Sequence, residues 1–419
     1  MARSARRAWT AGARNQLWLT GLFLALLGVF MITGSRAFTG WPMYESLLST
    51  LPLYGFLALG LTLVVAAGEM DLCFPATLAV AGFGFAVIAT HTGEVWLGLA
   101  AALLIGLGIG LCNGLLVAYV GVPSIIATIG TQFFWRGAVM LMSQGLALGL
   151  ADLTDSPVRL ALVGRLGGHI PMQALWLLAL AGVLWLVLNR HPLGDAVRFT
   201  GEQADVASRL GIDVPRARLG VHTLMGGIAG LAGAVGCMEM GSWWPTQGDG
   251  YMLLVFAAVF IGGTSVFGGS GKVYGTLVGI AIVGMIEAGI VSSGLSGFWT
   301  RAVHGMVIVV SVSAYAVLSG NADERLLRLL REGVRGSRHW EGKGKLSRES
   351  FLFPSPNPTP SSSKIFVFIE SLFDVFPVGG EAGRGISGHL QRFFRKWESL
   401  LRVGAVHCPD MVFPSWGRL

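Results

Sequence analysis

The sequence predicts an all-α polytopic membrane protein with about ten transmembrane helices. Hydrophobic residues make up 53% of its 419 positions and charged residues only 13%, whereas soluble domains usually carry about 25% charged residues. Apolar runs recur along most of the chain, and many approach the roughly 20 residues that a helix needs to cross a bilayer. The length alone would allow two or three soluble domains, but this composition argues against them.

Each predicted span is an apolar run that is long enough to form a membrane helix. In chain order, the runs fall near 17–33, 45–67, 72–90, 95–120, 124–143, 172–189, 217–240, 251–268, 273–292 and 298–319. The third run contains Pro75, which has no backbone N–H, so we expect this helix to start or break there. Broken helices are tolerated in transporters where they line a cavity. The sequence therefore predicts a broken third helix.

Glycines spaced four residues apart mark several of these runs. They occur at Gly106, Gly110 and Gly114, at Gly226 and Gly230, and at Gly275 and Gly279. Small residues in such a stripe let the backbones of membrane helices approach closely. The stripes therefore predict tight helix packing and need no chemical role.

Basic residues predict the orientation and the domain organisation. Residues 1–16 contain four arginines and no acid, which places this segment in the cytoplasm. The run that follows lacks an A-x-A-like cleavage site, which favours an uncleaved first helix over a signal peptide.

Ten spans between 17 and 320 put the arginine-rich segment 189–218 and the C-terminus in the cytoplasm as well. Residues 321–419 form a predicted cytoplasmic extension, largely disordered because its Ser, Pro and Lys content is high from about residue 333.

The sequence offers little sign of an enzyme or of a metal site. The segment "GRGISG" at 383–388 lacks the surrounding βαβ unit of a dinucleotide site, and "GGSGK" at 268–272 lacks the remaining features of a phosphate loop. The four cysteines form no CxxC pair, so neither a disulfide framework nor a zinc site is indicated. The net charge of +7 fits membrane orientation better than nucleic-acid binding, because the arginines flank apolar runs. We therefore expect no catalytic, cofactor-binding or metal residues.

Ionisable residues inside the apolar runs are the first candidates for function, since a charge there costs a few kcal/mol. They are Glu69, Asp71, Arg136, Glu239 and Glu287. We predict that Asp71, Arg136 and Glu287, together with the helix-breaking Pro75, belong to a translocation path. For Glu69 and Asp71 an interfacial turn remains the alternative.

A polar segment, "TGEQADVASRLGIDVPRAR", interrupts the apolar chain at 200–218. Thr200 and Gln203 match a capping box, and Gly211 stands where a left-handed residue ends many helices. We therefore expect a short capped helix over 201–210. Asp205 and Arg209 have the i,i+4 spacing of an ion pair, and a small apolar face is expected at Ala204, Ala207 and Leu210. About ten residues are too few for a stable isolated helix, so we expect it to dock on a partner protein or, alternatively, on its own chain.

Four segments in order carry a resemblance to a known family. They are "AGEMDLC", "PSIIATIGTQFFWRGAVMLMSQG", "HPLGDAVRFTGEQADVASRLGIDVPRAR" and "GDGYMLLVFAAVFIGGTSVFGGSGKVYGTLVG". Over residues 45–320 the chain resembles the permease subunit of bacterial ABC importers in the branch that serves ribose, xylose and other simple sugars. It departs from the family pattern at Glu69, where glycine is usual, at Cys73, which replaces serine, and at Glu287, where asparagine is frequent.

The resemblance implies a transport function with several partners. Two permease copies would pair in the inner membrane, with a cytoplasmic ATP-binding subunit, which in this branch is often two fused domains, and a periplasmic sugar-binding protein. The segment 200–213 would be the coupling helix on the ATPase, with Thr200, Gly201, Glu202, Ala204, Asp205, Ala207, Gly211 and Ile212 at the contact. The expected activity is ATP-driven import of a monosaccharide or polyol. Alternatives are another solute (a furanone signal, a nucleoside or a branched-chain amino acid) or a proton-coupled secondary transporter using Glu239 and Glu287.

Overall fold

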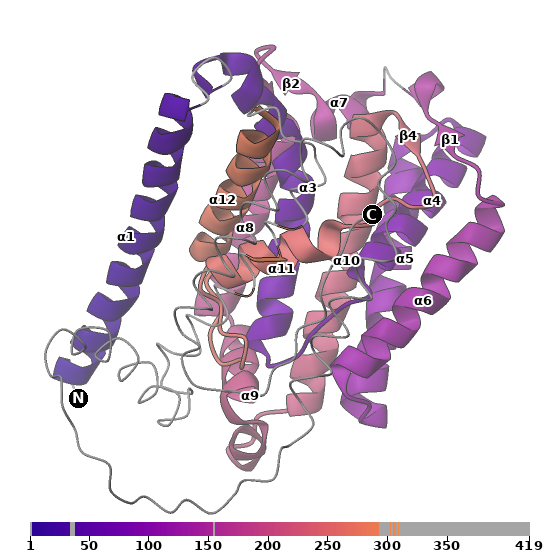
Figure 1. The fold of residues 1–419 in the computed structure, drawn as a ribbon. Coiled ribbons are helices and arrows are strands. Elements are labelled where there is room, and N and C mark those ends of the chain that lie inside the picture. The colour runs from indigo at the N-terminus through magenta and orange to yellow at the C-terminus, as the bar shows by residue number, and fades with distance from the viewer. Residues whose placement is uncertain are drawn as a thin grey trace, which may run out of the picture. The chain divides into compact units, whose positions relative to one another are not determined.

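The computed structural model describes residues 2–33, 38–153 and 156–292, and single positions between 302 and 309. The described part is almost entirely helical (Figure 1). Its α-helices are α1 (Ala2–Thr33), α3 (Trp41–Ala66), α4 (Phe74–Thr92), α5 (Val95–Leu115), α6 (Ser124–Ser143), α7 (Pro157–Val163), α8 (Met172–Arg190), α9 (Pro192–Arg209), α10 (Val214–Met240), α11 (Tyr251–Ile261) and α12 (Val273–Ser292). The shorter elements are a π-helical turn (Leu116–Val120), a 3-10 turn (Ala151–Leu153), β1 (Leu148–Gly149), β2 (Arg165–Leu166), β3 (Ile170–Pro171) and β4 (Ser242–Trp243).

Seven helices within the described residues are long and apolar enough to cross a membrane. They are Trp41–Ala66, Phe74–Thr92, Val95–Val120, Ser124–Ser143, Met172–Arg190, Val214–Met240 and Val273–Ile290. The α3 and α10 helices are central, because 78% of each apolar window is buried, whereas only 17% of the α6 window is buried. The exposed sides of α5, α6 and α8 are rich in Leu, Ile, Phe and Met, as expected for surfaces that face lipid.

The interval predicted as a span at 251–268 has a different structure. Its helix, α11, has 11 residues, which corresponds to a length of about 16 Å and is too short for a hydrocarbon core of about 30 Å. In Figure 1 this helix lies across the long helices instead of along them. The apolar part of α1, Leu19–Ile32, is also short. The predicted last span, 298–319, lies almost wholly outside the described residues, and the extension 321–419 lies entirely outside them.

The glycine stripes bring helix backbones into direct contact, as their spacing predicts. A Cβ atom added to Gly106 of α5 would overlap the carbonyl oxygen of Gly226 on α10, and one added to Gly226 would overlap the carbonyl oxygen of Gly106. The same relation holds between α12 and the end of α11, where a Cβ at Gly275 would overlap the carbonyl oxygen of Gly262. These contacts exist because the side chain at each position is a hydrogen atom.

Two short antiparallel ladders order the loops at the opposite end of the bundle from α9 (Figure 1). In one of them Leu148 pairs with Trp243, and Gly149 with Ser242. The fully buried Trp243 donates a hydrogen bond from Nε1 to the carbonyl oxygen of Ala79, at 2.9 Å. This ladder therefore fixes the start of the irregular segment 241–250 against α4.

Candidate functional site

The polar segment belongs to a helix that begins earlier than the sequence predicts. The α9 helix starts at Pro192, and the His191 side chain caps it by accepting a hydrogen bond from the backbone N–H of Leu193. Thr200 therefore lies inside the helix, buried, and its hydroxyl has no hydrogen-bond partner among the residues that the structure describes. The predicted capping box with Gln203 is wrong. Gln203 instead interrupts the helix, with φ −158° and ψ 98°.

The end of α9 matches the prediction. Gly211 adopts φ +85°, its N–H donates to the carbonyl oxygen of Ser208, and the N–H of Ile212 donates to that of Ala207. These two hydrogen bonds are the Schellman arrangement, which satisfies carbonyl groups left free by the helix end. The sequence signal was the isolated glycine followed closely by Pro215.

We expect Gly211→Val to destabilise the end of α9 by about 1–2 kcal/mol, because a β-branched residue at φ > 0 is strained. An added Cβ meets no atom of the described residues within 4 Å, so the expected cost comes from backbone strain and not from overlap at Cβ. Gly211→Asn should cost less, since asparagine tolerates the left-handed region. Thermal unfolding of both variants in the same detergent checks this order, and equal melting temperatures for the two would contradict it.

The predicted apolar face of the polar helix is exposed at Leu210 and partly at Ala204, but not at Ala207. Ala207 is buried against its own chain, so it cannot present a surface to a partner. Both Asp205 and Arg209 are described, and their side chains form no ion pair. The exposed large apolar side chains are Phe199 and Val206 of α9 and Leu210, which caps its C-terminal end, with exposed fractions of 47%, 45% and 69%.

Four glycines from three distant segments form a backbone contact that we call the glycine junction: Gly68, Gly201, Gly268 and Gly269. A Cβ at Gly201 would overlap the carbonyl oxygen of Ala66 and lie 2.5 Å from the amide nitrogen of Gly269. A Cβ at Gly268 would lie 2.5 Å from the carbonyl oxygen of Gly201 and 2.8 Å from the Cα of Gly68. The N–H of Gly269 also donates to the carbonyl oxygen of Ala66, at 2.9 Å. The junction therefore joins α9 to the end of α3 and to the loop that precedes α12.

Charged groups lie beside the glycine junction, between α3 and α4. Arg218, at the start of α10, places its Nε atom 2.6 Å from the Glu69 carboxylate, which is 8% exposed. Asp71 is buried, and its carboxylate accepts the backbone N–H of Cys73 at 2.7 Å. Pro75 lies in the first turn of α4. A backbone N–H at this position would have no intrahelical acceptor, so proline costs no hydrogen bond there. Asp71 and Pro75 thus define how α4 begins.

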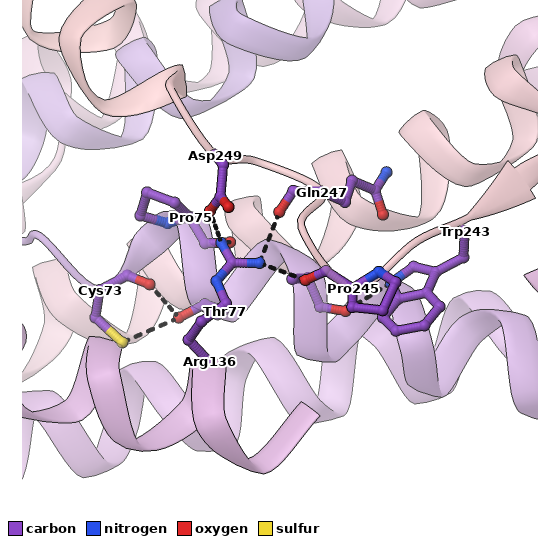
Figure 2. Close-up of polar contacts among 9 residues, drawn as sticks. Cys73, Pro75, Thr77, Arg136, Trp243, Pro245, Gln247 and Asp249 are labelled. Atoms are coloured by element: carbon purple, nitrogen blue, oxygen red, sulfur yellow. Dashed lines mark hydrogen bonds and ion pairs between the residues drawn. The ribbon is translucent and has the colours of Figure 1, made fainter. Parts of the chain in front are cut away.

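Arg136 of α6 binds three backbone carbonyls at once (Figure 2). Its Nη1 donates to the carbonyl oxygens of Pro245, at 2.7 Å, and Gln247, at 3.1 Å, while Nη2 donates to that of Pro75, at 3.2 Å. Nη2 also pairs with the half-exposed carboxylate of Asp249, at 2.9 Å. We call this arrangement the Arg136 clamp. It holds the segment 241–250 against the first turn of α4.

Two further contacts hold the segment 241–250 in place. Gln247 is buried, and its Oε1 accepts the thiol of Cys237, on α10, at 3.5 Å. Gly248, at φ +88°, lets the backbone pass so close to Pro75 that a Cβ would lie 2.9 Å from its carbonyl oxygen. The segment 241–250 is therefore fixed by α4, α6 and α10 together.

Glu287 lies apart from the other predicted path residues. With Tyr54 it lines a small, partly open pocket between α3, α11 and α12, whose other lining residues are aliphatic or glycine. The Tyr54 ring meets that of Tyr251 edge-on, with centroids 4.6 Å apart. The structure thus gathers Asp71, Pro75 and Arg136 around the start of α4, and places Glu287 at a second location.

Sequence reasoning missed several residues of this arrangement. The sequence patterns did not indicate Gln247 or Asp249 as site residues, and they gave no sign that Gly68, Gly268 and Gly269 lie together. Their signal was the concentration of glycines in "GGTSVFGGSG" and "TQGDG", since glycine is the residue that allows positive φ and close backbone approach.

These features define a polytopic helical membrane protein whose polar helix, α9, is joined by backbone contacts to its spans. The chain belongs to the family described as branched-chain amino acid transport system / permease component, whose sequence model matches residues 43–312.

The curated relatives include importer permeases. The ribose import permease protein RbsC of Escherichia coli strain K12 is 32% identical over 309 residues, which cover 73% of this chain and 94% of the relative. RbsC of Bacillus subtilis strain 168 is 32% identical over 64% of this chain and 82% of its own length. The L-arabinose transport system permease protein AraH of E. coli K12 is 30% identical over 62% and 77%. No solved structure matches the chain. The family and these relatives confirm the resemblance to permeases in the ribose branch of ABC importers.

Proposed function

We propose that this protein is the membrane-spanning subunit of an ATP-driven importer that carries a monosaccharide or related polyol across the bacterial inner membrane. The observation that carries the proposal is the glycine junction, which joins a polar helix to the spans in a chain related to sugar import permeases. A secondary carrier has no need of such a helix, whereas an ATP-driven carrier needs a part that receives motion from its ATPase.

The proposed partners are a cytoplasmic ATP-binding subunit of one or two fused domains, a periplasmic sugar-binding protein and a second permease copy. We assign the coupling role to α9. Within it Thr200, Gly201 and Ala207 face the chain itself and hold the helix in place, while Gly211 and Ile212 close its end. Glu202 and Asp205 are exposed and Ala204 is partly exposed, so they remain available to the ATPase.

The proposed transport mechanism is alternating access between two states of the permease pair, with ATP binding by the partner shifting the equilibrium. Asp71, Pro75 and Arg136 act in it by fixing how α4 begins, and Glu287 contributes a carboxylate on α12. Because Pro75 and the glycine junction flank the same short connection between α3 and α4, movement of α9 would reach the start of α4 directly.

The proposed topology has ten crossings between 17 and 320, including a third span that is broken before Phe74 and a crossing at 251–268 in which the 11-residue α11 forms only part of the path. Residues 1–16 and a C-terminal extension, 321–419, lie in the cytoplasm. The charge distribution supports this arrangement, since five arginines fall between 190 and 218. Labelling of single introduced cysteines in intact cells tests it, and labelling of the α9 loop from outside would contradict it.

Reconstituted uptake tests the proposed function. The chain would be placed in proteoliposomes with the ATP-binding subunit and the binding protein encoded beside it, and uptake of labelled ribose, arabinose, a nucleoside and a branched-chain amino acid compared. The expected result is uptake of a sugar, and this uptake should require ATP on the side of the membrane where the ATP-binding subunit lies. Uptake that persists without ATPase and collapses with a proton uncoupler would instead establish a secondary carrier, and ATP-dependent uptake of a different solute would correct the substrate.

A further inference from the structure

The loop between α11 and α12 presents one exposed aromatic side chain on an ordered turn. Phe267 is 59% exposed, although Thr264 and Ser265 just before it are buried. The N–H of Gly268 donates to the carbonyl oxygen of Ser265 at 3.2 Å, which closes a four-residue turn with Phe267 at its third position. Gly268 adopts φ +86°, so its conformation is one that glycine favours. We call residues 265–268 the Phe267 turn.

The Phe267 turn is fixed to the proposed coupling helix. The residue that closes it, Gly268, lies so close to Gly201 of α9 that a Cβ would be 2.5 Å from the Gly201 carbonyl oxygen. A Cβ on the following residue, Gly269, would lie 3.3 Å from the Cα of Glu202. A protein that docks on α9 therefore meets the Phe267 turn at the same end of the molecule.

The size of stable interfaces indicates that α9 alone is not the whole contact. Specific protein–protein interfaces bury about 800 Å² on each partner, from about 20–30 residues a side. The α9 helix has 18 residues, and several of them, including Val197, Thr200 and Ala207, are buried in the permease itself. The neighbouring surface must contribute the remainder, and large aromatic side chains supply much of the binding energy in such interfaces.

We propose that Phe267 is a second docking element for the ATP-binding subunit and acts beside Phe199, Val206 and Leu210 of α9. This inference rests on the proposed function. It assigns the loop before α12 a direct contact with the ATPase, so that closure of the ATPase moves α9 and the start of α12 together through the glycine junction.

Site-specific photocrosslinking in the assembled permease–ATPase complex tests the proposal. Phe267→p-benzoylphenylalanine preserves an aromatic side chain, and the expected result is a crosslink to the ATP-binding subunit. The same replacement at Val206 tests whether α9 contacts the ATP-binding subunit. At Phe133, which is 73% exposed on α6, the replacement serves as the control and should crosslink to lipid only. A crosslink to the ATPase from position 206 but only to lipid from position 267 would overturn this inference while the proposed function stands. Absence of ATPase crosslinks from both positions would overturn both.

Affinity measurements give an independent readout. Phe267→Ala is expected to weaken binding of the ATP-binding subunit by about tenfold, the loss typical of an aromatic anchor, and to reduce stimulated ATP hydrolysis at limiting ATPase concentration. The control, Phe133→Ala, should leave binding unchanged. Equal affinities for Phe267→Ala and the unmodified protein, with both permeases equally monodisperse in detergent, would show that Phe267 faces the membrane surface or solvent and is not a docking element.

Discussion

Gly201→Ala is expected to lower ATP-dependent uptake by about tenfold or more while the protein still inserts into the membrane. The added Cβ would overlap the carbonyl oxygen of Ala66 and lie 2.5 Å from the amide nitrogen of Gly269. Both are backbone atoms, so no flexible side chain can move aside, and overpacking of this kind typically costs about 1–3 kcal/mol. A change of about 1.4 kcal/mol in the balance between two conformations alters their ratio tenfold.

The measurement is uptake per inserted permease, together with ATP hydrolysis stimulated by the loaded binding protein. Gly220→Ala is the matched control, because its Cβ would meet Leu193 at an ordinary 3.5 Å. Gly220 lies on α10, close to α9, so both variants add one methyl group to a helix in the same region. Normal uptake by Gly201→Ala would show that the glycine junction is free to open and does not transmit motion from α9.

Arg136→Met is expected to destabilise the folded protein by about 3–5 kcal/mol. It leaves the carbonyl groups of Pro75, Pro245 and Gln247 without their donor, and all three residues are buried. A buried polar group that loses its partner costs about 1–3 kcal/mol. The stability of Arg136→Lys should fall between that of the unmodified protein and that of Arg136→Met. An ammonium group is a compact charge that cannot reproduce the planar fork of the guanidinium.

Asp249→Asn removes the ion pair with Arg136 but leaves the three carbonyl contacts of the clamp in place. The Asp249 side chain is 57% exposed, and exposed ion pairs contribute about 0–1 kcal/mol, so this variant should remain near the unmodified protein. Thermal unfolding in one detergent, followed by a buried-tryptophan signal and by size-exclusion chromatography, compares the set. If Asp249→Asn unfolded as readily as Arg136→Met, the ion pair and not the three carbonyl contacts would hold the segment 241–250.

The Arg136 clamp and the glycine junction lie at opposite ends of the connection between α3 and α4. The clamp joins the first turn of α4 to the segment 241–250, and the junction joins Ala66 at the end of α3, eight residues before Phe74, to α9. The departures from the family pattern, Glu69 and Cys73, lie in the connection between them. Glu69 gains a partner in Arg218, so the replacement of glycine adds a link between this connection and α10.

The sequence by itself determined the class of protein and most of its helices. Apolar runs of spanning length predicted α3, α4, α5, α6, α8, α10 and α12, because the bilayer sets both the length and the composition of a span. Gly211 and the stripes at Gly106 and Gly226 were also predictable, since a helix end and a small-residue stripe depend on residues only a few positions apart. The family followed from four ordered motifs without any tertiary information.

Only the tertiary structure decided which residues act together. Ala66, Gly201 and Gly269 are far apart in the chain, and no local pattern shows that their backbones touch. The same reason explains the errors: Thr200 looked like a helix cap and Ala207 like an exposed contact, but α9 begins at Pro192 and buries both side chains against its own protein. Likewise the apolar run at 251–268 has the composition of a span, yet its glycines pack on α12 and end the helix after 11 residues. Composition determines whether a segment is buried, whereas contacts between distant backbones determine what it is buried against.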